Sequence, residues 1–160
     1  MTRTVVGIDP STWCGMCRLT EDDSMGKVVN FPDSKGFERL QLIAQEVERT
    51  LRIWSPEFVL IEGYAIGHKS SVVKVIECGT VVRKVVYDLK IPWMEVRPTS
   101  LKLWTTGSGA AKKPDMARKV EERWGYKSHS DDIIDAYALA RMAQLSASTL
   151  LSIKGVSVGF

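Results

Sequence analysis

The feature that most limits the possible folds is a run of four apolar residues, Phe58-Val-Leu-Ile61, that ends at the acid Glu62. A strand with apolar side chains on both sides is typical of the inside of a sheet that is covered on both faces. Three earlier stretches, residues 4–8, 17–20 and 27–31, also have strand character and are separated by short polar segments. This spacing favours an antiparallel meander, with residues 21–26 as the turn between its last two strands.

Two longer stretches have helical spacing. Over residues 37–54 apolar side chains recur at steps of three and four and Pro56 follows, which predicts an amphipathic helix. Residues 71–89 are rich in valine, but their length and spacing also favour a helix. Residues 93–96 lie between these helical stretches and the C-terminal third, and they predict a fifth strand.

The C-terminal third carries helix start and stop signals. Pro98 and Pro114 suit first helical turns, and Gly125 suits the residue after a helix that ends near Trp124. Ser130 can cap a last helix over residues 131–144. The order of elements predicts an α/β fold with one mixed five-stranded sheet, three strands antiparallel and two parallel, flanked by helices.

Length and composition describe an ordinary globular chain. A chain of 160 residues that is 44% hydrophobic can bury roughly 70% of its surface in a single domain without disulfides. We expect one domain over residues 1–160, with a core at about 4–145 and an apolar tail, 146–160, that has no assigned structure. No apolar stretch is long enough for a membrane span or a cleaved leader, and the three cysteines are odd in number, so we expect reduced thiols and a cytoplasmic location.

Charge is unevenly distributed although the net charge is only +3. Residues 1–67 carry 7 basic and 10 acidic side chains, whereas residues 97–127 carry 8 basic and 3 acidic ones. The basic stretch also contains Trp104, Trp124 and Tyr126, a composition that suits contact with phosphates. A solvated helix face is the alternative interpretation.

Acidic residues follow two of the predicted strands. Asp9 comes directly after the first strand and Glu62 directly after the fourth, so their carboxylates should lie close together if these strands are neighbours. Asp132 and Asp135 are three residues apart on the last helix and share a face, whereas Asp131 is turned away from that pair. Because such carboxylates repel one another unless a cation lies between them, the pattern predicts a metal site, and Mg²⁺ prefers such oxygen ligands.

Three short segments resemble the acidic motifs of RuvC-type Holliday junction resolvases, a family of the RNase H-like superfamily. They are Gly7-Ile-Asp-Pro-Ser11, Leu60-Ile-Glu-Gly-Tyr64 and Asp132-Ile-Ile-Asp-Ala-Tyr-Ala-Leu-Ala140. The resemblance spans roughly residues 4–144 and implies an RNase H-like nuclease domain, with Asp9, Glu62, Asp132 and Asp135 as the catalytic, metal-binding carboxylates. The glycine-rich basic stretch before the last helices also resembles the family.

The resemblance implies a mechanism and partners. Two Mg²⁺ ions, for which Mn²⁺ can substitute, would support hydrolysis of a phosphodiester, and a homodimer would make paired symmetric nicks in a four-way DNA junction. Residues expected to contact DNA are Lys102, Lys112, Lys113, Arg118, Lys119 and Tyr64. His129 and Asp131 are possible assistants, and residues 71–89, with Gly79 allowing close approach, are either a dimer surface or a buried crossover helix.

Two departures from the family pattern, one in residues 127–131 with His129 and Asp131 and one after the second acid, accompany this interpretation together with several alternatives. Family members commonly carry an aromatic residue shortly after the second acid, and here Tyr64 and Ile66 have a different spacing. The substrate could therefore be a fork, D-loop or flap. A protein that binds junctions without cutting them is a further alternative, which the presence of all four acids disfavours. A thioredoxin-like role for Cys14-Gly-Met-Cys17 is disfavoured because strand-like residues follow. The compact chain suggests a phage-type member, acting in a bacterial or phage-infected cell.

Overall fold

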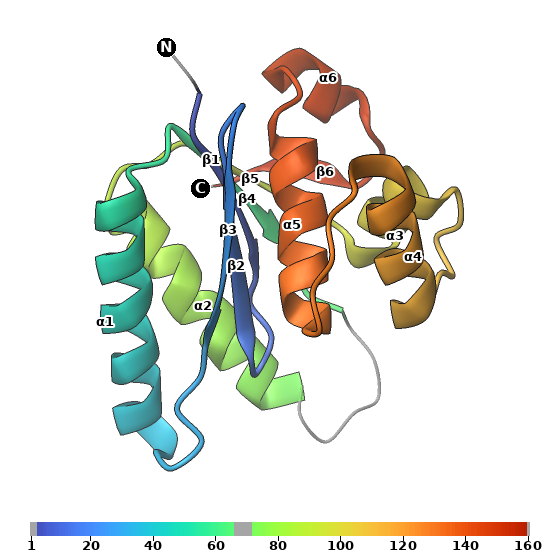
Figure 1. Ribbon diagram of the computed structural model, residues 1–160. Coiled ribbons are helices and arrows are strands. Elements are labelled where there is room, and N and C mark those ends of the chain that lie inside the picture. Colours follow the sequence, from blue (N-terminus) through green and yellow to red (C-terminus); the bar gives the residue numbers. More distant parts are fainter. Residues whose placement is uncertain (1–2, 66–71, 160) are drawn as a thin grey trace.

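The structure is a computed structural model that describes residues 3–65 and 72–159. In this part of the chain six strands form one sheet in the order β3-β2-β1-β4-β5-β6 (Figure 1). The strands are β1 (Val5–Asp9), β2 (Cys14–Leu19), β3 (Ser24–Val29), β4 (Phe58–Glu62), β5 (Trp93–Val96) and β6 (Val156–Val158). The helices are α1 (Gly36–Trp54), α2 (Val72–Asp88), α3 (Pro98–Thr106), α4 (Lys113–Trp124), α5 (Asp131–Ala143) and α6 (Ala147–Ser152).

The predicted mixed sheet is confirmed, with one strand more than expected. β1, β2 and β3 pair antiparallel, and β1, β4 and β5 pair parallel. The sixth strand comes from the tail that had no assigned structure: β6 pairs antiparallel with β5, after α6 has turned the chain back. This strand is only three residues long and has no alternating pattern, so its sequence gives little signal.

The third strand begins earlier than predicted. The expected turn over residues 21–26 is wrong, because Ser24–Gly26 are already paired with Cys17–Leu19 of β2. The chain reverses within Thr20–Asp23, where the Thr20 amide donates to the Asp23 carbonyl at 2.9 Å and the Thr20 hydroxyl accepts from the Asp23 amide at 3.0 Å. These local hydrogen bonds complete the turn in four residues, which leaves Ser24-Met-Gly free to continue as strand.

The helices cover both faces of the sheet. α1 and α2 lie on one face, and α5 lies on the other together with α3 and α4 (Figure 1). Because side chains alternate along a strand, Val6 and Ile8 of β1 enter the core under α1 and α2, whereas Val5 enters the core under α5. β4 alternates in the same way, with Leu60 towards α5.

The predicted helix boundaries agree with the structure to within a residue or two. α3 and α4 have prolines in their first turns, and Gly125 ends α4 in the left-handed conformation (φ 67°). The Ser130 hydroxyl caps α5 by accepting from the Ile133 amide at 3.4 Å. No helix among the described residues is sufficiently long and apolar to cross a membrane.

Candidate active site

Strand alternation brings two of the predicted carboxylates to the same face of the sheet. Along β1, Val5, Gly7 and Asp9 point to the α5 side, and along β4, Phe58, Leu60 and Glu62 do so. The parallel register pairs Ile8 with Ile61, so the next residues of the two strands, Asp9 and Glu62, emerge at the same level. Both acids therefore stand at the carboxyl end of adjacent central strands, opposite the start of α5.

Two glycines let α5 approach the sheet closely. A Cβ atom on Gly7 would lie 2.1 Å from the Ala136 carbonyl oxygen, and one on Gly15 would lie 2.2 Å from the Asp132 carbonyl oxygen. Gly15 is paired with Asp9 across the β1–β2 ladder. The first turn of α5 is thus held against the strand position beside Asp9, which brings Asp132 and Asp135 to the two strand-end acids.

The four carboxylates line a single pocket of about 530 Å³. Its wall also contains the loop after β1, the residues after Glu62, two valines of α2 and one lysine from the start of α4. The other lining residues are Pro10, Ser11, Thr12, Trp13, Gly63, Tyr64, Ala65, Val72, Val75 and Lys113. The pocket therefore collects side chains from β1, β4, α2, α4 and α5.

Burial and mutual repulsion raise the pKa of each carboxyl group. Asp9 is only 8% exposed, and burial followed by the charges of Glu62 and Asp135 raises its pKa well above the ordinary value. Burial and then Asp135 raise the pKa of Glu62 to about 8, and burial and then Asp132 raise the pKa of Asp135 to about 6. Burial also raises the pKa of Asp132, against the hydrogen bond that the Ser11 hydroxyl donates to it at 3.1 Å. The four carboxylates therefore have too little positive charge around them to stabilise their ionised forms.

The donor set suits a hard cation. Among the described residues no group donates a hydrogen bond to the carboxylate of Asp9, Glu62 or Asp135, although all three are largely enclosed. Oxygen-only carboxylate sites are those that Mg²⁺ and Mn²⁺ occupy in proteins. In residues 3–65 and 72–159 no three His, Cys, Asp or Glu side chains lie close enough together to form a metal centre in this structure.

Arg83 of α2 fixes the chain after Glu62, a contact that the sequence did not indicate. Its guanidinium donates to the Glu95 carboxylate at 2.6 Å, to the Gly79 carbonyl at 2.9 Å and to the Glu62 carbonyl at 3.2 Å. It also lies 4.2 Å from the centroid of the Tyr64 ring. Tyr64, predicted to contact DNA, is therefore packed against α2 on one side while it lines the pocket on the other.

Replacing Arg83 with Met should destabilise the protein by about 2–4 kcal/mol, because Glu95 loses its partner and the Glu62 carbonyl loses a donor. Urea unfolding at pH 7 would measure the change. Arg52→Met is the matched control, since Arg52 pairs with Glu48 on the exposed face of α1 and should contribute less than about 1 kcal/mol. Equal destabilisation by the two substitutions would contradict this role of Arg83.

The structure separates the predicted basic residues into two groups. Lys113 lines the pocket and forms an ion pair with Asp131 at 3.2 Å, and the charge of Lys102 lowers the pKa of Glu62 and of Asp135. Arg118 and Lys119 lie on α4, where both pair with Glu122.

The remaining predicted residues lie outside the pocket lining. Lys112 precedes α4, and its amide donates to the Asp115 carboxylate at 3.0 Å. His129 is exposed, and Asp131 is exposed and turned to Lys113. Gly79, considered as a close-approach point for a second chain, is buried instead against Tyr64 and Arg83 of its own chain. A Cβ atom there would lie 2.6 Å from the Tyr64 ring, so this expectation is wrong.

A mixed sheet of this order, with acids at the ends of two adjacent central strands and on the helix packed across them, defines the RNase H-like class of proteins. The family model for crossover junction endodeoxyribonuclease RuvC matches residues 5–142. This chain belongs to the RuvC family.

Similar proteins and structures agree with this assignment. The chain is 28% identical over 134 residues to the crossover junction endodeoxyribonuclease RuvC of Synechococcus sp. (strain CC9605), covering 82% of this chain and 80% of that relative. It is 27% identical over 148 residues to the RuvC of Prochlorococcus marinus (strain MIT 9211), covering 87% of this chain and 94% of that relative. The structure of T. thermophilus RuvC in complex with Holliday junction substrate superposes with a TM-score of 0.73 at 26% identity, over 86% of this chain and 90% of that one.

Proposed function

We propose that this protein is a divalent-metal-dependent endonuclease that resolves four-way DNA junctions by paired symmetric nicks. The observation that carries the proposal is the pocket lined by Asp9, Glu62, Asp132 and Asp135 in a chain of the RuvC family. Within the described residues no group donates a hydrogen bond to the carboxylate of Asp9, Glu62 or Asp135. A similar solved protein is RuvC in complex with Holliday junction substrate.

The four carboxylates would hold Mg²⁺, with Mn²⁺ as a substitute. Two such ions, when bound, supply Lewis-acid activation of a water and stabilise the oxygen that leaves the scissile phosphodiester. The protein's own part is to hold the carboxylates on rigid elements: Asp9 and Glu62 at strand ends, and Asp132 and Asp135 on a helix locked by Gly7 and Gly15. Ser11 orients Asp132 through its hydrogen bond.

Lys113 would bind the phosphate at the site. It lines the carboxylate pocket, and its hydrogen bond to Asp131 raises its pKa, so it stays protonated. Asp131 thereby acts as a positioning residue for Lys113. Lys102, Lys112, Arg118 and Lys119 would continue a basic track along α3 and α4. Contacts of this kind read the DNA backbone and its shape and carry no base information.

A substrate panel tests the proposed specificity. Labelled four-way junction, fork, D-loop, flap and linear duplex would be incubated with the protein in Mg²⁺, in Mn²⁺ and in EDTA. Metal-dependent cutting of the four-way junction in preference to the other substrates supports the proposal. Cutting of the fork or flap alone would keep the chemistry and replace the substrate, and binding without cutting in either metal would leave a junction-binding protein.

A homodimer would supply the two cuts, and α2 offers the surface for it. Val73, Ile76, Thr80 and Tyr87 recur at steps of three, four and seven and are exposed, Ile76 by 45%. Such a stripe on a helix pairs readily with its own copy around a twofold axis.

Ile76→Glu should convert the dimer to a monomer, because it would place two carboxylates in the contact. Sedimentation velocity would measure this, with Leu151→Glu on α6 as a control that exchanges an equally exposed apolar residue elsewhere. Identical sedimentation of wild type and Ile76→Glu would contradict the α2 interface.

A further inference from the structure

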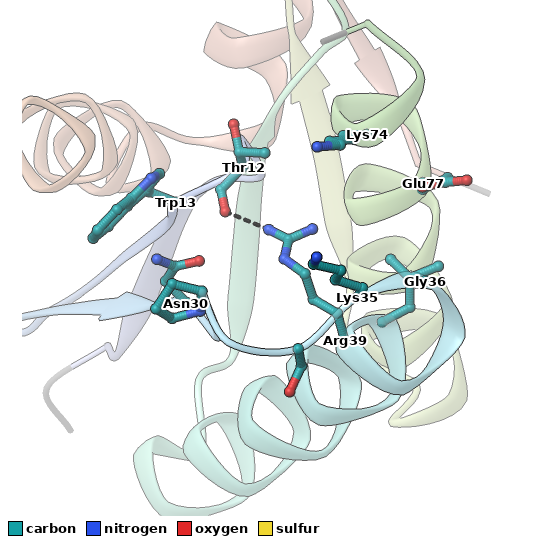
Figure 2. A pocket seen from close by; sticks show the side chains of 11 residues that line it. Thr12, Trp13, Asn30, Lys35, Gly36, Arg39, Lys74 and Glu77 are labelled. Carbon is teal, nitrogen blue, oxygen red and sulfur yellow. Dashed lines mark hydrogen bonds between the residues drawn. The ribbon is translucent and has the colours of Figure 1, made fainter.

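A separate cavity, with basic side chains in its wall, adjoins the carboxylate pocket on the side away from α4. It has a volume of about 400 Å³ and lies between the loop after β1, the chain after β3 and the first turns of α1 and α2 (Figure 2). Thr12 and Trp13 line both cavities, so the two form one continuous surface around this loop. No run of basic residues marks this surface in the sequence, because Lys35 and Arg39 lie at the start of α1 and Lys74 lies on α2.

Three cations surround this cavity: Lys35, Arg39 and Lys74. None of them forms an ion pair within the described residues. The single acid in the lining is Glu77, whose carboxylate points away from Arg39 in Figure 2. Among the described residues the lining therefore has more positive than negative charge, and no ion pair offsets the three cations.

An exposed aromatic ring, that of Trp13, lines the same cavity as the cations. The Arg39 guanidinium donates to the Thr12 carbonyl at 2.7 Å, which ties α1 to the loop that carries Trp13 (Figure 2). The Trp13 side chain is 56% exposed, which is unusual for the largest apolar residue of a folded chain. Exposed aromatic rings beside cations are the means by which proteins bind a nucleic-acid strand, since bases stack on the ring and phosphates contact the cations.

We propose that this cavity, with Lys35, Arg39, Lys74 and Trp13, binds the DNA strand next to the scissile phosphate, on the side opposite the basic track of α3 and α4. The inference rests on the proposed function and deepens it. Charge complementarity and continuity with the carboxylate pocket identify the occupant as a DNA backbone that runs over Trp13. The strand would thus be held on both sides of the phosphate that is cut.

Binding measurements separate this surface from the rest of the protein. Fluorescence anisotropy of a labelled four-way junction in EDTA, at several salt concentrations, would compare wild type with Lys35→Gln/Lys74→Gln. We expect the Kd to rise about 10- to 30-fold near 0.15 M salt and the salt slope to fall by about 2, because two phosphate contacts are lost. Trp13→Ala should weaken binding about fivefold or more with the salt slope unchanged, since stacking is not ionic.

Two control variants test whether a loss of binding is specific to the charges of this cavity. Arg52→Gln/Lys90→Gln removes the same charge at the C-terminal ends of α1 and α2, away from the cavity at their first turns, and should change the Kd less than about twofold. Lys35→Arg/Lys74→Arg keeps the charge and should retain wild-type affinity. If Lys35→Gln/Lys74→Gln binds as tightly as the control pair while wild type binds and cuts junctions, the cavity does not contact DNA and the proposed function stands. If wild type neither binds nor cuts branched DNA, both proposals fail.

Discussion

Replacing Asp9 with Asn is expected to abolish junction cleavage and, in the same protein, to raise its stability. Asp9 is the most enclosed of the four carboxylates, and burial and its neighbours' charges raise its pKa. The neutral amide removes a metal ligand, so the single-turnover cleavage rate should fall by at least about a thousandfold. It also removes a repulsive buried charge, so the free energy of unfolding in EDTA at pH 8 should rise by about 1–3 kcal/mol.

The pH dependence of stability provides a second readout. In metal-free buffer Glu62 and Asp135, with pKa values raised to about 8 and about 6, keep protons that the unfolded chain has already released. The free energy of unfolding therefore falls as the pH rises from about 4.5 towards 8. Asp9→Asn should make this fall shallower. Asp22→Asn, at an exposed turn position, is the control and should change neither cleavage nor stability. A destabilised Asp9→Asn protein would contradict the electrostatic argument.

Gly7→Ala is expected to cost at least about 3 kcal/mol of unfolding free energy. Its new methyl group would overlap the backbone of α5, 2.1 Å from the Ala136 carbonyl and 2.5 Å from the Ala140 amide, and backbone atoms move less easily than side-chain ends. The protein that remains folded at low temperature should have lost cleavage too, because α5 carries Asp132 and Asp135. Urea unfolding would measure the loss of stability, and a cleavage assay at about 10 °C would measure the loss of activity.

Gly109→Ala is the matched control for this substitution. Its nearest new neighbour is the Thr99 carbonyl oxygen at 3.3 Å, so the change should cost less than about 1 kcal/mol and leave cleavage intact. If Gly7→Ala unfolded at the same urea concentration as Gly109→Ala, the close approach of α5 to β1 would not determine the site.

Much of the site was accessible from the sequence because its acids occur at marked positions. Asp9 and Glu62 end apolar strands, and Asp132 and Asp135 have helical spacing in the second half of the chain. The features that bring these acids together are harder to recognise in the sequence. Gly7 and Gly15 have their roles because α5 crosses them, and the order of the strands in the sheet determines that crossing.

Other features could not be predicted for identifiable physical reasons. Arg83 acts on Glu62 across 21 positions of sequence, and no local pattern marks such a contact. β6 is too short for a periodic signal, and Ser24-Met-Gly has the composition of a turn although pairing with β2 makes it strand. The cavity with Lys35, Arg39, Lys74 and Trp13 is lined by residues of the β1–β2 loop, α1 and α2, so only the fold brings its cations together.

Whether the protein resolves four-way junctions can be measured by cleavage of a junction labelled in turn on each of its four strands, by wild type and by Asp9→Asn, in Mg²⁺ and in EDTA. The proposed resolvase function predicts two cuts at symmetric positions in opposed strands, in wild type with Mg²⁺ only, while Asp9→Asn still binds the junction. Wild-type protein that binds the junction but leaves all four strands intact in Mg²⁺ and in Mn²⁺ would contradict it.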